Sequence, residues 1–537
     1  MKRRLFLFIA LSAVIALSAE VHIQVDDPET WSGEKLRPYI GQTVIFDVPM
    51  IVCSNSNNNY VVSPWRRFQP ENQGTIGSDE YNETVRVNSS CMFSISNVPS
   101  PTTAMGEPMH RCGEKIIGLK ATVNSTSSLT FKDGKWKGNT RADLEKSLPH
   151  LGDYRLLVCG FNLENYFMTW GSMGADSYAE HQKQRAKISK ALAKINADIY
   201  GLVELQQGNE AIGEIVSDLK KNHPGRNYKY FSKPSAGTMQ KVDFVYDANK
   251  VYPIGIPVET TVETSDRKKM VCFREKETGE KFIYSINHFK AMNSGDESRR
   301  VNEAKAVVDL YNSYRQNRNI RDDDVLIMGD LNCYAMTAPI QVFKDRGLID
   351  MHRAFHADSS YSYMFSNLTS YIDHAICNNT IFRQITGMAA YHINSDEDDK
   401  YNYQRSSDNT MFRCSDHDPV LVGLKLDSTI TGDPYFNNGN FGMDSVSFYY
   451  SYVPGEENNN PLVYFDIYTV SGYKVCGPTP IQFNGINTED HHKYYTFSQD
   501  NPDLPQEIKD FLPLPAGVYV IHLYYSDVVK SHKLIVQ

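Results

Sequence analysis

The stretch RCSDHDPVLVGLKL, residues 413–426, joins a polar cluster to an apolar run. Residues 420–426 have the composition of a mostly buried β-strand. Asp416, His417 and Asp418 directly precede this run, so two carboxylates and an imidazole stand at the mouth of a predicted strand. Catalytic and binding residues of α/β proteins gather at such positions. The stretch therefore predicts both an α/β domain and a functional segment.

Upstream of this stretch, from about residue 151 to 426, short apolar strands alternate with helical patterns, as in α/β domains. The predicted strands are RLLVCGF (155–161), DIYGLVE (198–204), FIYSIN (282–287), VLIMG (325–329) and SYIDHAI (370–376). Ser177 and Glu180 form a capping-box pattern at the start of one helix, and its lysines, Lys187 among them, are expected off the apolar face. A second helix is predicted over about 296–315.

Polar residues follow or end strand after strand in this region. They are Asn162, Glu204, His288, Asp330 with Asn332, Asp373, and Asp416 with His417. A single Asp or His at a strand end is usually a turn former or a cap. A series of carboxylates, amides and imidazoles at equivalent positions predicts a common site for a metal or a phosphate instead.

Five motifs in this order resemble the endonuclease/exonuclease/phosphatase superfamily. They are FNLEN (161–165), GLVELQQG (201–208), NHFK (287–290), GDLN (329–332) and SDHDPV (415–420). The resemblance covers roughly residues 150–426. It implies a four-layer α/β sandwich, in which two mixed β-sheets pack face to face, helices lie outside and the active site lies at one end.

The resemblance also implies hydrolysis of a phosphodiester with Mg²⁺ or Mn²⁺, a hard cation that neutralises charge on the phosphate oxygens. Glu204 is expected to be the leading metal ligand, with Asn162 and Asp416 beside it. Asp330 is expected to orient and deprotonate the attacking water, with Asn332 bonding the phosphate or the nucleophile.

Two imidazoles complete the expected site. His417 is expected to face the scissile phosphate with its ring fixed by Asp373, and His288 to stabilise charge in the transition state. We expect Asp330 and His417 to be surface residues of a cleft, and Asp418 to point away and serve the turn. Arg267, in DRKKMVCF (266–273), is either a phosphate contact or part of a solvated charged turn.

The two flanking regions have a β-like texture. Residues 20–148 resemble the small OB-like domain of secreted bacterial nucleases, a fold that presents a strand face to single strands or oligosaccharides, although a purely structural role fits equally. After a linker at 427–444, residues 445–537 resemble the β-sandwich sorting domain of type IX secretion substrates. An ordinary binding sandwich is the alternative. Three early cysteines, Cys53, Cys91 and Cys112, are numerous enough for one disulfide in an oxidising compartment.

Residues 1–19 have the basic start, the apolar run and the small residues of a cleaved secretory signal. The apolar run is shorter than the roughly 20 residues of a membrane span, so stable membrane insertion is not expected. With the sorting domain, the signal implies export to the medium or the cell surface of a Gram-negative bacterium by the type IX machinery.

A net charge of −9 argues against a broad electrostatic grip on nucleic acid or anionic membrane. A metal-assisted phosphate site is compatible with it. The sequence therefore favours a secreted, metal-dependent phosphodiesterase, first of all an extracellular nuclease with DNA or RNA as substrate. A sphingomyelinase-like or inositol-phosphate hydrolase is the close alternative, and a catalytically inactive surface binding protein is the alternative of another class.

Overall fold

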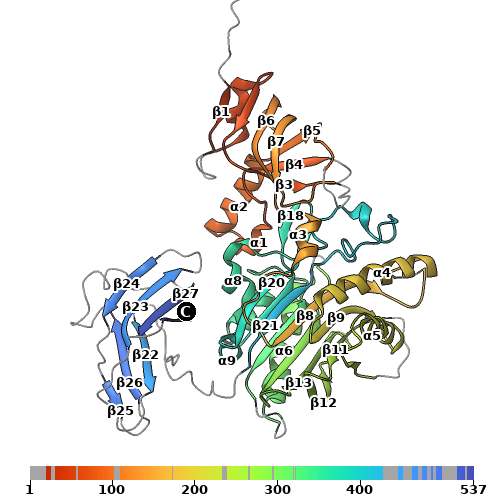
Figure 1. Cartoon of the computed structure of the whole chain (residues 1–537), viewed down its shortest axis with the longest axis vertical. Helices are drawn as coiled ribbons and strands as arrows, with labels where there is room; N and C mark the ends of the chain where they lie inside the picture. The colour runs from red at the N-terminus through yellow and green to blue at the C-terminus, as the bar shows by residue number, and fades with distance from the viewer. Residues whose placement is uncertain are drawn as a thin grey trace, which may run out of the picture. The chain divides into compact units, whose positions relative to one another are not determined.

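The computed structural model describes residues 20–426, apart from gaps at 26–30, 56–58, 102–108, 172, 233–238, 264–265, 293–294, 318–319 and 321, and the strands between residues 445 and 536 (Figure 1). The chain divides into two compact units. One contains residues up to 68 together with 82–143, and the other contains 69–81 together with 144–537. The expected signal (1–19) and linker (427–444) lie outside the described residues.

Two six-stranded mixed sheets form the centre of the second unit. The first has the order β10 (Tyr228–Tyr230), β11 (Gln240–Asp247), β9 (Ile199–Gln206), β8 (Leu156–Tyr166), β21 (Val420–Leu424), β20 (Ile385–Ala390). The second has the order β12 (Val251–Glu259), β13 (Lys268–Glu275), β14 (Lys281–His288), β15 (Val325–Asp330), β19 (Asp373–Cys377), β16 (Ile349–Asp350). All five strands predicted in this region form, with shifts of a few residues at their ends.

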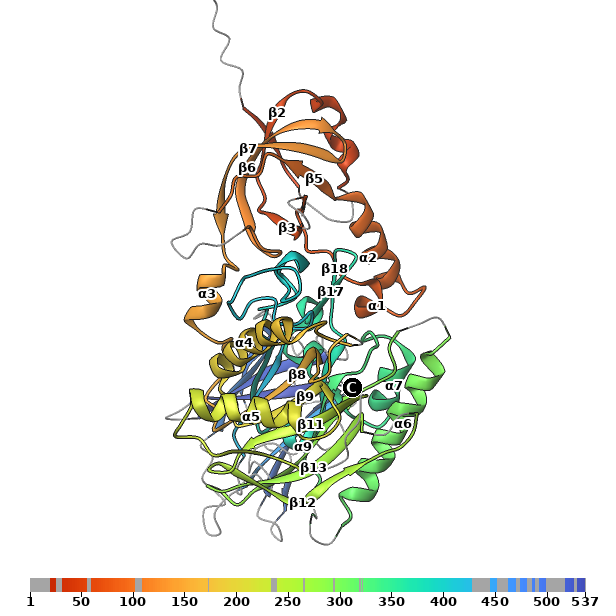
Figure 2. The ribbon, with the colours of Figure 1, turned by 90° about the vertical axis from the view of Figure 1, so that its right-hand side faces the viewer.

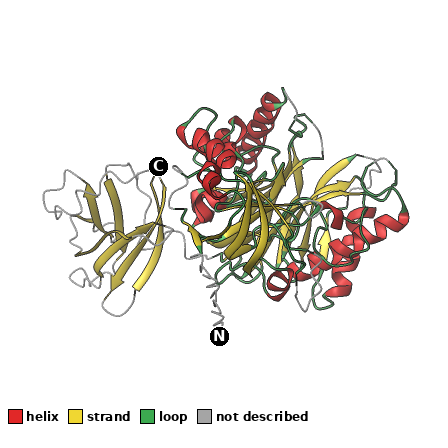
Figure 3. Cartoon of the chain, turned by 90° about the horizontal axis from the view of Figure 1, so that it is seen from above, coloured by secondary structure: helices red, strands yellow, loops and turns green. Residues whose placement is uncertain are grey.

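The sheets pack face to face, and helices cover their outer faces. Val203 and Phe244 of the first sheet share a buried core with Ile286 and Met328 of the second. Helices α4 (Tyr178–Ile195) and α5 (Glu210–Asn222) cover the first sheet, and α6 (Glu297–Tyr314) and α7 (Ala338–Lys344) cover the second (Figure 2). Seen from above, helices flank the strands on two sides (Figure 3). The predicted four-layer α/β sandwich is therefore confirmed.

Helix α4 begins as its capping pattern predicts, because Ser177 Oγ accepts a hydrogen bond from the Glu180 N–H. The Glu180 carboxylate accepts from the Asp176 N–H and so extends the cap by one residue. Lys187, which the sequence pattern places off the apolar face of this helix, is nevertheless not exposed. This side chain is fully buried, and its Nζ lies 3.6 Å from Oδ2 of Asp408.

Smaller elements connect the layers of this unit. They are α1 (Pro70–Gln73), α8 (Met351–His356), α9 (Asn379–Phe382) and the hairpin of β17 (Tyr363–Phe365) and β18 (Leu368–Ser370). None of the helices in the described part of the chain is long and apolar enough to cross a membrane.

The N-terminal unit is a single sheet in the order β1 (Val21–Ile23), β2 (Thr43–Phe46), β6 (Lys115–Ser125), β3 (Met50–Ser54), β4 (Tyr60–Ser63), β5 (Phe93–Ser96), β7 (Ser128–Lys137). Because β7 also pairs with β6, the five strands from β6 to β7 form a closed ring. Helix α2 (Asp79–Ser90) lies between β4 and β5 in sequence, and α3 (Arg141–Lys146) follows β7. Cys53 and Cys91 are buried thiols that donate to backbone carbonyls, so the disulfide considered for this region does not form.

The C-terminal region contains strands only among its described residues. Three form the sheet β22 (Ser445–Ser451), β26 (His492–Ser498), β25 (Gly485–Asn487), and four form the sheet β24 (Lys474–Pro480), β23 (Leu462–Thr469), β27 (Gly517–Tyr525), β28 (Val529–Val536). This all-β content agrees with the texture of the sequence after residue 444.

Candidate active site

Strand register brings the polar strand ends of the α/β part together. In the parallel pair β14–β15, His288 lies opposite Asp330, and in the antiparallel pair β15–β19, Asp330 lies opposite Asp373. In the other sheet, the parallel strands β8 and β9 carry Asn162 and Glu204 near their ends. The two packed sheets thus present five of the expected residues at one end of the sandwich.

The backbone at this end departs from ordinary strand geometry. Glu204 has a φ of 64°, a left-handed conformation that costs a non-glycine residue roughly 1 kcal/mol. Gly329, with a φ of 125°, lies so close to β14 that a Cβ atom would stand 2.0 Å from the Asn287 carbonyl oxygen. The glycine of the GDLN motif is therefore required by the close approach of β14 to β15.

Asp330 is held by two amide groups. Its Oδ2 accepts from Asn162 Nδ2 at 3.1 Å, and its Oδ1 accepts from the Asn332 N–H at 2.9 Å. The Asn332 side chain donates in turn to the Phe289 carbonyl. The Asn162 oxygen accepts from the Glu164 N–H, so this amide orients Asp330 in the structure. Its expected role as a metal ligand stays a prediction.

His417 and Asp373 form the pair that the sequence predicts. Nδ1 of His417 lies 2.8 Å from Oδ2 of Asp373, and the same oxygen accepts from Ser362 Oγ. Burial alone would lower the pKa of His417, but the carboxylates of Asp373, Asp416 and Asp330 outweigh it and raise this pKa well above its usual value. Both ring nitrogens therefore carry protons at neutral pH, and Nε2 presents a positive charge to the site.

Burial changes the proton affinity of the other central groups. It raises the pKa of Asp330 to about 7, with the Asp373 and Glu204 carboxylates adding to the effect and His417 opposing it. Burial, reinforced by the positive charge of Arg267, lowers the pKa of His288 well below its usual value. Asp330 is thus a base suited to neutral pH, and His288 is a neutral imidazole available as a ligand or hydrogen-bond partner.

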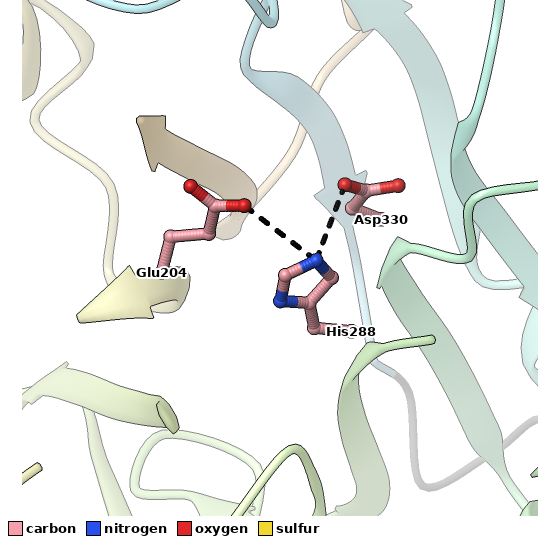
Figure 4. Close-up of side chains that lie close together, drawn as sticks. All are labelled: Glu204, His288 and Asp330. Carbon is pink, nitrogen blue, oxygen red and sulfur yellow. Dashed lines mark ion pairs between the residues drawn. The ribbon is translucent and has the colours of Figure 1, made fainter. Parts of the chain in front are cut away.

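Glu204, His288 and Asp330 offer a metal-binding arrangement (Figure 4). His288 Nε2 lies 3.6 Å from a Glu204 oxygen and 3.7 Å from an Asp330 oxygen. Burial, followed by the charge of Asp416, raises the pKa of Glu204, which indicates negative charge that a cation would neutralise. His288 Nδ1 is buried and has no hydrogen-bond partner among the described residues. This donor set fits a small divalent cation held mainly by carboxylates.

A cavity of about 490 Å³ opens over these groups. Its lining includes Glu204, His288, Asp330, Asn332 and His417, and it also includes Arg267 and Lys290. The structure thus places Arg267 at the cavity, where its Nη2 donates to the Phe289 carbonyl and its Nε has no partner in the described part of the chain. The alternative of a solvated turn is excluded for this side chain.

The expectation that Asp330 and His417 are surface residues of a cleft is wrong. Asp330 and His417 are only 2% and 6% exposed, so they form the floor of the cavity and not its surface. Asp418 is fully buried and accepts hydrogen bonds from Asn394 N, Ser395 N and Ser395 Oγ. It therefore fixes the segment that follows β20, whereas Asp416 remains half-buried beside His417.

Sequence reasoning assigned no role to the apolar side of the cavity. Tyr334, Tyr363 and Phe365 line it, and the Tyr363 ring lies 4.8 Å from the His417 ring. Phe365 is 60% exposed at the tip of the β17–β18 hairpin. The aromatic run before Asp373 was the available signal, but only the fold shows that it faces the catalytic groups.

Residues 161–417 match the sequence profile of the endonuclease/exonuclease/phosphatase family. None of the curated proteins matches the chain. The solved structures that resemble it include an endonuclease/exonuclease/phosphatase family protein from Bacteroides thetaiotaomicron, with 20% identity, a TM-score of 0.38, and 51% of this chain and 98% of that chain covered. They also include the mannosyl-6-phosphatase of the same species, with 20% identity, 50% and 100% coverage and a TM-score of 0.37. The catalytic domain of human Nocturnin with bound sulfate shares 14% identity, with 51% and 94% coverage and a TM-score of 0.37. The profile match supports an endonuclease/exonuclease/phosphatase superfamily domain over residues 161–417.

Proposed function

We propose that the endonuclease/exonuclease/phosphatase domain is a divalent-metal-dependent phosphodiesterase, and that its substrate is nucleic acid. The observation that carries this proposal is the convergence of Asp330, Glu204, His288 and the Asp373–His417 pair at the floor of one cavity. A binding protein on an inactive fold has no need of this arrangement, in which a base and a charged imidazole lie within 4 Å of each other.

The residues divide the chemistry between them. Glu204 would hold Mg²⁺ or Mn²⁺ together with the nearby His288, and Asp416 and Asn162 are the further ligands that the sequence predicts; the cation would supply charge neutralisation on the phosphate oxygens. Asp330 accepts a proton from the attacking water as the water oxygen bonds to phosphorus. The bond between phosphorus and the leaving ester oxygen breaks, and its electron pair stays on that oxygen. His417, protonated and oriented by Asp373, stabilises the negative charge that develops there. Asn332 and Asn162 keep the Asp330 carboxylate aimed at the cavity.

The cavity wall supports nucleic acid as the substrate class. Arg267 and Lys290 offer positive charge, and Tyr334, Tyr363 and Phe365 offer flat surfaces on which bases stack. Phe365 also favours one alternative, a phospholipid diester as in sphingomyelinases, because an exposed aromatic side chain at a hairpin tip can enter a bilayer surface. Inositol phosphates fit the basic residues but make no use of the aromatic wall.

The flanking regions are proposed to serve export and binding. The closed ring of five strands supports an OB-like N-terminal domain, which would bind single strands. The all-β C-terminal region supports a type IX sorting domain, and residues 1–19 a signal for export from a Gram-negative cell to its surface or medium.

The test uses the purified protein without residues 1–19, with His417→Ala as control. Each is incubated with plasmid DNA, single-stranded RNA, sphingomyelin vesicles and an inositol phosphate, in Mg²⁺ or in EDTA. Metal-dependent cleavage of a nucleic acid by the parent protein alone supports the proposal. Release of phosphocholine or phosphate with intact nucleic acid would show that the substrate is a phospholipid or an inositol phosphate instead. No hydrolysis of any substrate would overturn the enzymatic assignment.

A further inference from the structure

A short segment from an early part of the sequence belongs to the catalytic unit. Residues 69–81 are preceded and followed by residues of the N-terminal unit, yet they cluster with residues 144–537. The segment begins with Gln69 and the one-turn helix α1 (Pro70–Gln73). Asn72 is 1% exposed, which is unusual for an amide side chain in so short a helix. The start of the segment, with Pro70 and Asn72 buried, is therefore packed against this unit, whereas residues 75–77 are exposed.

Four hydrogen bonds join this segment to the walls of the cavity. The Gln69 N–H donates to the Thr369 carbonyl at 2.9 Å, and Asn72 Nδ2 donates to the Tyr371 carbonyl at 3.3 Å. The Asn72 carbonyl accepts from Arg353 Nη1 at 2.9 Å. The fourth bond runs from the Met336 N–H to the carbonyl of Glu71 at 2.9 Å.

Three of the four partner residues lie within a few positions in sequence of residues that line the cavity. Thr369 lies in β18 of the hairpin, Tyr371 follows it two residues before Asp373, and Met336 lies two residues after Tyr334. The connection is short, because only Ile372, itself a cavity residue, separates Tyr371 from Asp373. A displacement of the Tyr371 carbonyl therefore moves the carboxylate that orients His417.

A second set of contacts fixes the backbone between Tyr371 and Asp373. The Tyr371 ring stacks on His352 with centroids 4.2 Å apart, and Tyr371 OH donates to Asp350. His352 Nε2 lies 2.8 Å from the Asp373 carbonyl oxygen, which only a donor can approach, so Nδ1 accepts from Ser360 Oγ. Asn72 and His352 thus bond carbonyl groups two residues apart, those of Tyr371 and Asp373, at the start of β19.

We infer that residues 69–73 are a positioning segment of the active site, which keeps Asp373, and through it His417, in the geometry for phosphodiester hydrolysis. The inference rests on the proposed function. It makes Asn72 a positioning residue that never touches substrate, and it makes a part of the chain outside residues 151–426 necessary for full catalysis.

Two variants of the full chain test this role, and two more serve as controls. Asn72→Asp keeps the shape of the side chain and removes the donor to the Tyr371 carbonyl. Gln69→Pro removes only the donor to Thr369, because Gln69 has φ −63° and ψ 124°, values that proline adopts, and Gln69→Ala controls for the lost side chain. Asn88→Ala is the matched control. Asn88 is also a buried amide that donates to a backbone carbonyl, that of Phe68, but it lies in the N-terminal unit.

Two measurements are made on each variant. The first is kcat and KM for a small diester, bis(p-nitrophenyl) phosphate, with Mg²⁺. The second is the low-field proton resonance of His417 Nδ1–H, assigned by its loss in His417→Ala. We expect Asn72→Asp and Gln69→Pro to lower kcat about tenfold with little change in KM, and to shift or broaden the resonance. Asn88→Ala and Gln69→Ala should change neither.

The outcomes separate the inference from the proposed function. If Asn72→Asp and Gln69→Pro keep the kcat and the resonance of Asn88→Ala, the segment has no positioning role. If the parent protein does not hydrolyse the diester, the proposed function fails, and the resonance alone then decides whether the segment orients His417. If one of the two test variants, Asn72→Asp or Gln69→Pro, no longer unfolds cooperatively, the conclusion is drawn from the other.

Discussion

His417 and Asp373 are joined by a hydrogen bond of 2.8 Å between Nδ1 and Oδ2, which leaves Nε2 of the same ring 3.9 Å from Oδ2 of Asp330. One carboxylate orients the ring, and the other lies where the attacking water is proposed to lose its proton.

Asp373→Asn should lower kcat by about two to four orders of magnitude while KM changes little, because the ring loses the acceptor that fixes its orientation and charge. Steady-state kinetics with Mg²⁺ measures both constants. Asp198→Asn is the control, since Asp198 is a buried carboxylate that accepts from the Leu157 N–H far from the cavity. Equal effects of the two substitutions would contradict the assigned role of Asp373.

Glu204→Gln should stabilise the metal-free protein and weaken its response to Mg²⁺. Burial and the nearby Asp416 raise the pKa of Glu204, so a neutral amide relieves an unfavourable charge that only a cation would compensate. Thermal unfolding in EDTA and in Mg²⁺ measures the effect. We expect a higher Tm than that of the parent in EDTA and a smaller gain on adding Mg²⁺. If the Tm of the parent protein does not change on addition of Mg²⁺ or Mn²⁺, the result argues against the metal site.

The acid stability of the domain should depend on His352. Burial lowers the pKa of His352 from 6.5 to about 3. Between these two values the unfolded chain binds a proton that the folded protein does not, so the stability contributed above pH 6.5 is lost as pH falls towards 3. His352→Gln keeps an N–H donor for the Asp373 carbonyl and cannot titrate. As the pH falls below 6, we expect the free energy of unfolding of His352→Gln to decrease less steeply than that of the parent. The two slopes should differ by about 1.4 kcal/mol per pH unit.

Chemical denaturation at a series of pH values between 4 and about 7 measures this difference. Other buried histidines titrate in both proteins, so their contribution cancels in the comparison. Parallel curves for the parent and His352→Gln would show that His352 is protonated in the folded protein.

Phe365→Ala should impair the hydrolysis of nucleic acid more than the hydrolysis of a small diester. Loss of one stacking surface costs roughly 1–3 kcal/mol in binding, which corresponds to a rise in KM for an oligonucleotide of about 5-fold to about 150-fold. Hydrolysis of bis(p-nitrophenyl) phosphate should stay within a small factor of the parent. Binding to sphingomyelin vesicles, measured by sedimentation, distinguishes the lipid alternative, because a loss there with unchanged oligonucleotide KM would favour a membrane role for Phe365.

The main elements of the α/β domain could be predicted from sequence because their signals are local. Apolar runs of five to eight residues ending in polar residues marked the strands that carry Glu204, His288 and Asp330. The expectation that helix α4 begins at Ser177 held for the same reason. The order of the motifs then placed the polar strand ends at one site.

Features that depend on long-range contacts could not be predicted. Lys187 looked like a surface lysine, but a carboxylate more than 200 residues later in the sequence compensates its burial. Asp418 looked like a turn residue, yet its partners Asn394 and Ser395 lie in a segment without a readable pattern. The inclusion of residues 69–81 in the catalytic unit has no local signal at all, since only the fold brings Asn72 to Tyr371.

The pairing of β8 with β21 has a consequence for the modular history of this chain. These are the first and last strands of the α/β sandwich in sequence, and they are hydrogen-bonded neighbours with Leu156 opposite Leu424. Entry and exit of the polypeptide therefore lie side by side, so the sandwich can be inserted into another protein, or circularly permuted through a short linker, at little entropic cost. Exchange of the flanking modules leaves this pairing intact, provided that residues 69–73 travel with the sandwich.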